Sequence, residues 1–381
     1  MENRSLTTEI RDKFFSIVRA GLNQSTELPA LSEIECKELM KIGAHQSILP
    51  IIHRGLKLSG APSGIVKECD KVRLKDTRLY IFQKDALQKI GIALNEAQIS
   101  YIPLKGAVLR QLYPEPELRT SCDIDVLVKE DDVEVAVAAI EKATDFVKKK
   151  RNYHDISMVN SQVHLELHFS ILENMENIDR LLARVWDYAV FDECSRYKLT
   201  PEFQIFHVIA HMSYHMVHSG LGIRPFLDLW LLRMKTEYDE DIVRRMCADC
   251  SIITFYEKCC NLVDAWMTGK PVPENLTAFE NYTLNGGVFG NKENAIASKQ
   301  RQHRGFSYYF HRVFMSRALL ETEYPELKEK PFLVPICQMK RWLRLLNPNK
   351  RRQVRLEIAN VKTMKPETID SFDKLLESLQ L

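Results

Sequence analysis

The sequence predicts an α+β fold in which a small mixed β-sheet core lies between an N-terminal helical segment and a larger C-terminal helical region. Three observations favour this architecture. Apolar residues recur at three- and four-residue spacing over residues 1–98, which is the period of an amphipathic helix. Over residues 99–175 they occur in short strand-like runs, and over residues 176–381 the helical spacing returns. We expect these three ranges to be the structural divisions of the chain.

The N-terminal segment is expected to be helical throughout. Its apolar periodicity is clearest over residues 9–22, 33–58 and 77–98. Pro29 and the sequence "SGAPSG" at residues 59–64 separate these stretches, because proline and glycine interrupt a helix.

The expected core mixes strands with short helices. A helix that begins with acidic residues gains from the positive end of its dipole, and two strands separated by two polar residues are typical of a hairpin. The predicted order is a strand at 100–104, a short helix at 106–113, a strand at 122–128, a helix at 130–143, and a hairpin of strands at 155–160 and 163–169. Beyond the core, helices are clearest at 202–220 and 226–235, and residues 284–295 are the most loop-like stretch.

Composition excludes some classes of protein. The net charge is +2 with both signs interspersed, so the chain lacks the overall basic excess of proteins that slide along nucleic acid. No window approaches the roughly 18 uninterrupted apolar residues that span a bilayer, so we expect no membrane contact. The nine cysteines are odd in number and scattered, and the N-terminus lacks an apolar signal segment. These features predict a cytoplasmic protein with free thiols.

The sequence "CDIDVLV" places two carboxylates in a predicted strand. Asp123 and Asp125 point to one face because side chains alternate along a strand. In "VHLELHF", His164, Glu166 and His168 likewise share a face. If the two strands are neighbours, three carboxylates converge, and their mutual repulsion would raise their pKa values and destabilise the fold.

A divalent cation would remove that repulsion. Carboxylate oxygens favour Mg²⁺ or Mn²⁺, and paired ions of this kind support phosphoryl or nucleotidyl transfer. The alternative is that the two aspartates lie on a solvated strand face at a sheet edge. Beside them, "PLKGAVL" contains Gly106, where the backbone can approach a ligand, and Lys105 supplies a positive charge next to that turn. Arg119 lies four residues before Asp123, although each of these cations is also compatible with ordinary surface charge.

These motifs resemble those of the DNA polymerase beta-like nucleotidyltransferase superfamily. More narrowly, "IPLKGAVLRQLYPEPELRTSCDIDVLV" with "VHLELHF" is similar to an uncharacterised bacterial nucleotidyltransferase family with an L-K-G turn, an R-x-x-x-D-x-D strand and an E-x-H strand. The sequences "AHMSYH", "RPFLDL", "GGVFG" and "EYPELKEKPFLVPICQMKRWLRLL" also look like that family's helical region. The resemblance covers most of the chain.

The resemblance implies a reaction and its residues. Asp123 and Asp125 would bind two metal ions, with Glu166 as the third carboxylate and a candidate general base. Lys105 and Gly106 would hold the triphosphate of a nucleoside triphosphate (NTP). The implied product is an acceptor, whether small molecule, RNA or protein, that carries a nucleoside monophosphate on a hydroxyl or similar group, with pyrophosphate released.

Other residues modify this hypothesis or leave alternatives to it. Ala107 stands where the superfamily usually has a serine, so nucleotide affinity would depend on backbone amides, Lys105 and Arg119. His168 is a further candidate for the nucleotide site or for support of the carboxylates. If Glu166 is not the third carboxylate, Glu173 or Asp155 is the next candidate. A catalytically weak or inactive module that binds a nucleotide or a partner on the same fold is the competing hypothesis.

Histidines and cysteines suggest two possible zinc sites. His207, His211, His215 and His218 share one helical stripe, which either binds zinc, with Asp228 as a guessed third ligand, or lines the cleft, the interpretation we favour.

The C-x-x-C at 247–250 and the cysteine pair at 259–260 are expected to be buried free thiols, because continuous helix separates them. The basic runs at 148–151 and 349–355 are either solvated faces or contacts with phosphate backbones.

Overall fold

The computed structural model describes most of the chain and confirms the α+β class. The residues described are 7–24, 27–286, 314–317, 320, 324, 327, 330–343, 347, 351–352 and 366–381. The strands are β1 (Tyr101–Leu104), β2 (Asp123–Val128), β3 (Val147–Arg151), β4 (Asp155–Val159), β5 (His164–His168), β6 (Ala189–Glu193) and β7 (Arg196–Leu199). The helices up to the sheet's last strand are α1 (Thr8–Gly21), α2 (Glu33–His45), α3 (Leu49–Leu58), α4 (Ser63–Glu96), α5 (Gly106–Leu109), α6 (Val133–Ala143) and α7 (Glu176–Leu182). Those that follow are α8 (Pro201–His218), α9 (Ile223–Lys235), α10 (Glu240–Asp249), α11 (Ile253–Thr268), α12 (Thr277–Gly286), α16 (Val334–Leu343) and α18 (Pro366–Leu379).

Helices α1 and α2 begin at side chains that cap them. The Thr7 side chain accepts a hydrogen bond from the Ile10 backbone N–H at the start of α1, and Ser32 with Glu35 forms a reciprocal capping box on α2. The buried faces of α1 to α3 join one apolar core with α8 to α11, in which the ring of Phe15 stacks on Trp266 at 4.7 Å. The N-terminal segment is therefore packed against the C-terminal helices.

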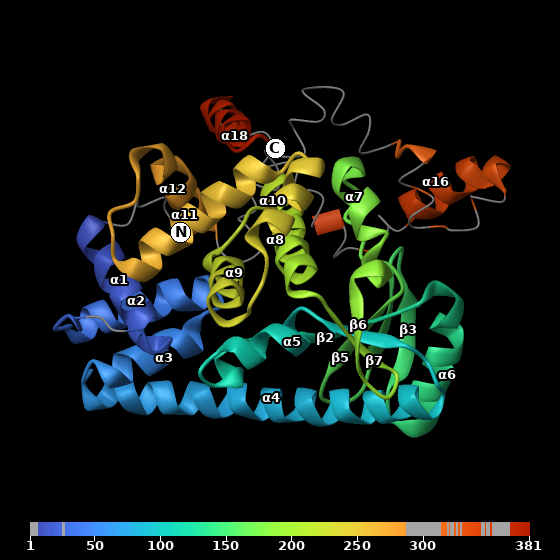
Figure 1. Ribbon diagram of the computed structural model, residues 1–381, viewed down its shortest axis with the longest axis horizontal. Helices are drawn as coiled ribbons and strands as arrows, with labels where there is room; N and C mark the ends of the chain where they lie inside the picture. The colour runs from blue at the N-terminus through green and yellow to red at the C-terminus, as the bar shows by residue number, and fades with distance from the viewer. Residues whose placement is uncertain are drawn as a thin grey trace.

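Helix α4 connects the N-terminal helices to the sheet. It runs along one side of the molecule, beneath α5 and the strands, while α8, α10 and α11 lie on the other side (Figure 1). The helix begins at Ser63, directly after Pro62, and so is longer than the stretch at 77–98 that the sequence predicted. Its buried residues Ala86, Ile90 and Leu94 pack against the sheet.

The sheet has seven strands in the order β3-β4-β5-β2-β1-β7-β6 within the described residues. At its centre β2 pairs in parallel with β5 and antiparallel with β1, and β4 and β5 form the predicted hairpin. One face is apolar and packs against α4 and α6 through Val126 and Leu167, among others. The other face carries the polar side chains of β2 and β5, because side chains alternate along each strand.

The sheet extends beyond the core that the sequence predicted. Strands β6 and β7, at residues 189–199, lie in a range expected to be helical, and β3 is formed by the basic run at 148–151 with Val147. The β6–β7 turn contains Cys194 at φ 51°, a position usually marked by glycine or asparagine, so the sequence carries no clear hairpin signal there.

Two other predicted features include residues that the structure does not describe. Of the expected loop at 284–295, residues 284–286 belong to α12 and the remainder lies outside the described residues. Of the basic run at 349–355, only 351–352 are described, and they are helical. Among the helices that the structure describes, none combines the length and apolarity needed to cross a membrane.

Candidate active site

Register places the predicted carboxylates side by side. In the parallel pair of β2 and β5, Asp125 is the partner of Glu166 and Asp123 is the partner of His164. Paired positions on neighbouring strands point to the same face, so these four side chains gather on the polar face of the sheet. The structure thus brings together Asp123, Asp125 and Glu166, which the sequence had assigned to two separate strands.

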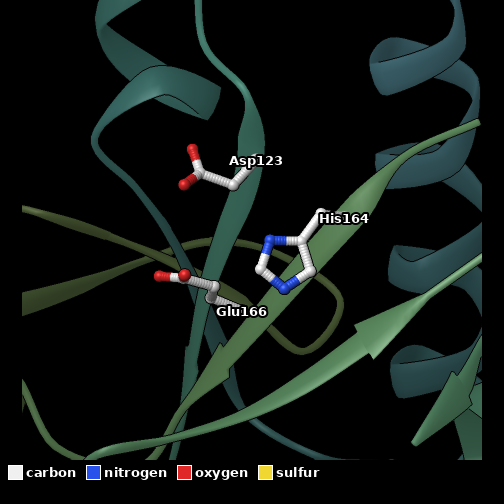
Figure 2. A group of neighbouring side chains, drawn as sticks. All are labelled: Asp123, His164 and Glu166. Atoms are coloured by element: carbon white, nitrogen blue, oxygen red, sulfur yellow. The ribbon is translucent and has the colours of Figure 1, made fainter. Parts of the chain in front are cut away.

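Two overlapping groups of these side chains offer ligand atoms for a metal ion. One is Asp123, His164 and Glu166, and the other is Asp125, Glu166 and His168; in each, the ligand atoms lie within 4.8 Å of one another. Figure 2 shows the carboxylates of Asp123 and Glu166 pointing to the same side, with the His164 ring next to them. Glu166 belongs to both groups, so it is the carboxylate that connects them.

Asp125 is buried, and two basic side chains compensate its charge. Its Oδ1 lies 3.3 Å from Lys105 Nζ and 2.9 Å from His168 Nε2. Burial alone would raise the pKa of the Asp125 carboxyl, but Lys105 and His168 outweigh burial and hold the pKa well below its ordinary value. Burial would likewise lower the pKa of His168, and its contacts with Asp125 and Glu166 raise it instead. The site therefore holds a charged carboxylate between two basic groups.

The turn from β1 into α5 has an unusual backbone. Lys105, the residue before α5, has φ 42°, a region that L side chains rarely adopt. A β-carbon at Gly106 would lie 2.8 Å from both Arg119 Nη1 and Ser121 Oγ, so the position accepts only glycine without a shift of its neighbours. Ser121 Oγ in turn donates to Asp123 Oδ1 at 2.9 Å. The glycine turn and the first aspartate are thereby in direct structural contact.

Arg119 is bound by a carboxylate that the sequence did not connect with it. Its Nε and Nη2 each donate to an oxygen of Asp228 at 2.8 Å, and the Tyr113 hydroxyl donates to Asp228 Oδ1 at 2.8 Å. Burial would lower the pKa of Arg119, but Asp228 outweighs burial and raises it. The ion pair connects the sheet region to α9, and a contact between Arg119 and a triphosphate stays a prediction.

A cavity of about 350 Å³ lies beside the two aspartates. It leaves room for ligands next to Asp125 although Lys105 and His168 contact that carboxylate. A smaller cavity of about 160 Å³ adjoins it. The polar residues of the larger cavity include Lys105, Arg119, Ser121, Asp123, Asp125, Arg196, Lys198, His207, His211, His215, Arg224 and Asp228. Those of the smaller cavity include Lys105, His154, His168, Ser170, Glu173, Asn174, His207, His211, Tyr214 and His215.

Three of the four histidines of the predicted stripe on α8 line these cavities, which confirms the favoured interpretation for those three. His207, His211 and His215 line both of them. His218 lines neither of the two, and its Nδ1–H donates to the Tyr214 backbone oxygen, 2.9 Å away. Within the described residues, these histidines join no group of three or more potential metal ligands, and Asp228 is occupied by Arg119. The described structure therefore favours a cavity wall over a zinc site.

Glu173 and Asp155, the reserve candidates for a third carboxylate, lie outside both metal-ligating groups found in the described part of the chain. Glu173 Oε1 is 2.7 Å from His211 Nδ1, and Asp155 Oδ1 accepts a hydrogen bond from the Asn152 side chain at 2.8 Å. Burial would raise the pKa of Glu173, but His211 and Lys105 outweigh burial and lower it to about 2. Glu173 is thus an ionised partner for a histidine.

The remaining sequence motifs have structural roles. All nine cysteines lie within the described residues as free thiols, and the C-x-x-C at 247–250 and the pair at 259–260 are buried, as expected. In the basic run at 148–151, Lys148 and Arg151 both contact Glu134, at 2.9 and 2.7 Å. Part of this run is therefore paired on the surface.

Sequence reasoning missed several residues that the cavities bring together. Ser121 carried no signal of its own, and Asp228 was considered only as a guessed zinc ligand. A single carboxylate within the apolar run "FLDLWLL" of α9 could have indicated a buried ion pair, because a charge in such a position requires a partner. Its partner could not have been identified, since Arg119 lies more than a hundred residues earlier.

Comparison with known proteins gives one informative result. A family model described as "Uncharacterised nucleotidyltransferase" matches residues 32–268, which is more than half of the chain. The searches of curated proteins and of solved structures found no match. The matched range contains α2 to α11 and all seven described strands, and with them every residue of the candidate site discussed above.

Proposed function

The chain belongs to the family of uncharacterised nucleotidyltransferases, and we propose that it transfers a nucleoside monophosphate from an NTP to a hydroxyl or similar group, with release of pyrophosphate. One observation carries this proposal: Asp123, Asp125 and Glu166 gather from two adjacent strands on one sheet face, beside a cavity lined by Lys105 and Gly106. The acceptor is a small molecule, an RNA or a protein.

The donor set supports a divalent ion. Asp123, Asp125 and Glu166 would hold Mg²⁺ or Mn²⁺, because these ions prefer carboxylate oxygens, and His164 lies within reach of Asp123 and Glu166. When bound, such an ion neutralises phosphate charge and favours attack at the α-phosphorus. The fit rests on the overlap of the two ligand groups at Glu166, because each group brings its ligand atoms within 4.8 Å of one another.

The chain's own groups account for substrate binding in this proposal. Lys105, whose pKa is raised because Asp125, Glu173 and Glu166 outweigh its burial, stays charged and is placed to contact a triphosphate. Gly106 leaves the cavity floor free of a side chain next to Arg119 and Ser121. In-line displacement then needs only that the acceptor oxygen and the leaving pyrophosphate lie on opposite sides of the α-phosphorus.

A labelling assay tests the proposal. The protein is incubated with each of four α-labelled NTPs, with Mg²⁺ or Mn²⁺ and a cell extract, and transfer of label and release of pyrophosphate are measured. We expect the wild type to release pyrophosphate and Asp123→Asn, Asp125→Asn and Glu166→Gln to lose at least about 100-fold in rate. Glu193→Gln, an exposed carboxylate on β6, is the matched control and should keep wild-type activity. Equal rates in Asp123→Asn and wild type would reject the metal role of Asp123.

A second candidate function has one observation in its favour. Because Lys105 and His168 already compensate the charge of Asp125, the pocket is also compatible with a module that binds a nucleotide without metal and without turnover. Thermal shift with ATP, CTP, GTP and UTP, each with and without Mg²⁺, separates the two. Stabilisation by an NTP that needs no metal and survives Asp123→Asn would favour the binding module.

A further inference from the structure

Helix α8 presents three histidines to the site without any role in the metal-ligating groups. His207, His211 and His215 line the larger cavity, which is also lined by Asp123 and Asp125, and they line the adjoining smaller cavity as well. A group bound at the junction of the two cavities therefore touches this histidine wall and lies next to the carboxylates. Neither the family match nor the metal site explains why the wall should be built from histidines.

Glu173 orients one of these histidines. Its Oε1 lies 2.7 Å from His211 Nδ1, and its side chain is 13% exposed. Because the pKa of Glu173 is lowered to about 2 by His211 and Lys105 in spite of burial, the carboxylate is ionised and can only accept a hydrogen bond. Nδ1 of His211 must therefore carry a proton, and in the neutral ring the lone pair is on Nε2. Glu173 thus fixes the ring so that its basic lone pair is on Nε2, which is the orientation that a general base requires.

A second histidine continues the hydrogen-bonded chain. His211 Nε2 lies 3.0 Å from His215 Nε2, and His215 Nδ1 lies 3.0 Å from Ser219 Oγ. Burial lowers the pKa of His215 to about 3, so this ring is neutral and adds no positive charge next to His211. When His215 carries its proton on Nδ1 and donates it to Ser219 Oγ, its Nε2 lone pair faces His211 Nε2. A proton gained at His211 Nε2 is then donated to His215 Nε2 while the Nδ1–H bond of His211 to the carboxylate stays in place.

We propose that His211, held by Glu173, is the general base that takes the proton of the acceptor hydroxyl, and that the acceptor enters by the smaller cavity. The inference rests on the proposed nucleotidyl transfer. In the step, the acceptor O–H bond breaks and its proton goes to His211 Nε2. The acceptor oxygen forms a bond to the α-phosphorus, and the bond from that phosphorus to the pyrophosphate oxygen breaks, with its electron pair leaving on pyrophosphate.

Glu166, the base implied by the resemblance, fits this task less well. It lines neither of the two cavities described, and its carboxylate lies 3.6 Å from His168 Nε2. The Glu166 carboxylate also belongs to both metal-ligating groups of the described residues. Glu166 is better suited to ligate a cation than to remove a proton.

The smaller cavity indicates the chemistry of the acceptor. At about 160 Å³ it holds a single small group, such as one sugar ring or one side chain. Its wall combines apolar Leu104 and Ile171 with the hydrogen-bonding groups of Ser170, Asn174 and Tyr214. This lining suits a neutral hydroxyl-bearing group, because it offers hydrogen-bonding groups and because the positive charge of Lys105 is balanced by the negative charge of Glu173 on the same wall.

Variants of the full-length protein test the base. In the labelling assay, His211→Ala should lose about 10²- to 10⁴-fold in kcat while the KM for the NTP is unchanged, and added imidazole should restore part of the rate. Glu173→Gln should lose about 10- to 100-fold, again in kcat and not in KM. The matched control is His218→Ala, on the same helix but lining neither of the two cavities, and it should behave as wild type.

The outcomes of this experiment separate a failure of the His211 proposal from a failure of the proposed nucleotidyl transfer. If Asp123→Asn is inactive and His211→Ala turns over at the wild-type rate, His211 is not the base and the proposed function stands. If His211→Ala is inactive, unfolds at a lower temperature and does not respond to imidazole, its role is structural and the inference is wrong. If the wild type releases no pyrophosphate from any NTP, the proposed function fails, and the inference fails with it.

Discussion

Lys105 Nζ lies 3.3 Å from Oδ1 of Asp125, the same oxygen that lies 2.9 Å from His168 Nε2. Asp125 is only 4% exposed, so its charge would be unstable there without these two partners. Lys105 also lines both cavities, so the lysine that neutralises the carboxylate is the one that we propose contacts phosphate. A divalent ion held by Asp125 would replace Lys105 as the counter-charge of that carboxylate and would leave Lys105 available to a phosphate group; we call this replacement the exchange.

Lys105→Met tests this exchange. Loss of the ammonium leaves Asp125 with His168 alone, so the free energy of unfolding should fall, by less than the roughly 3–5 kcal/mol of a fully broken buried pair. Mg²⁺ should recover part of the loss, and urea unfolding with and without Mg²⁺ measures both. Lys198→Met, which removes a 60% exposed cation from the same cavity wall, should change stability by under about 1 kcal/mol. A deficit in Lys105→Met that Mg²⁺ leaves untouched would contradict the exchange.

The Arg119–Asp228 pair predicts a large structural effect. Both side chains are nearly inaccessible, at 7% and 5% exposed, so Asp228→Asn leaves a buried guanidinium without its counter-charge. We expect a loss of about 3–5 kcal/mol in the free energy of unfolding, measured by urea denaturation. In the more exposed pair of Arg233 and Asp264, the matched change Asp264→Asn should cost under about 1 kcal/mol. Equal losses in the free energy of unfolding for Asp228→Asn and Asp264→Asn would show that burial does not determine how much an ion pair contributes to stability.

The site was predictable from the sequence where the signal was local. Strand periodicity placed Asp123 and Asp125 on one face and Glu166 on one face of its own strand, because alternation depends only on the chain's own geometry. That the two strands are neighbours was only a condition of the prediction, and their parallel pairing is seen in the structure. The α+β class was predictable for the same reason, since helical and strand periods are properties of short segments.

Contacts between distant segments were not predictable. Asp228 contacts Arg119, and Glu173 contacts His211, only because helices α8 and α9 pack over the sheet. A single sequence does not specify which residues of a packed helix face which residues of the sheet. The ion pair between Asp125 and Lys105 was not predicted. The sequence of a lysine next to a glycine turn is the same whether the lysine contacts solvent, phosphate or a carboxylate.

Gly106→Ala tests the close packing at the glycine turn. The added β-carbon would lie 2.8 Å from Arg119 Nη1 and from Ser121 Oγ, and the first of these is fixed by its ion pair. Relief of the clash should cost about 1–3 kcal/mol and lower kcat, because Ser121 also donates to Asp123. Gly64→Ala, where nothing among the described residues lies within 4 Å of the new atom, should lose neither stability nor activity. Thermal unfolding and pyrophosphate release measure the two effects, and wild-type values for Gly106→Ala would contradict the packing.

His53 on α3 predicts a pH-dependent effect. It is 2% exposed, and neither ring nitrogen has a hydrogen-bond partner among the residues that the structure describes. Burial lowers the pKa of His53 from 6.5 to about 4, so the unfolded chain binds a proton first as the pH falls. The contribution of neutral His53 to the free energy of unfolding is complete above about pH 6.5, and it is lost as the pH falls towards about 4.

His53→Leu should therefore flatten the acid side of the stability curve. Between pH 7.5 and pH 4.5 the wild type should lose about 2.5 kcal/mol more than the variant, as measured by urea unfolding at both pH values. His45→Leu, which alters an exposed histidine of α2, should follow the wild-type curve. Parallel curves for His53→Leu and wild type would mean that His53 is protonated or solvated in the folded protein.

Mn²⁺ binding measured by titration calorimetry tests the central claim most directly, because the claim is that carboxylates from β2 and β5 form one metal site. The account predicts that Asp123→Asn and Glu166→Gln each weaken Mn²⁺ binding at least about 10-fold, while Glu193→Gln binds Mn²⁺ like the wild type. Wild-type affinity for Mn²⁺ in both Asp123→Asn and Glu166→Gln would contradict it.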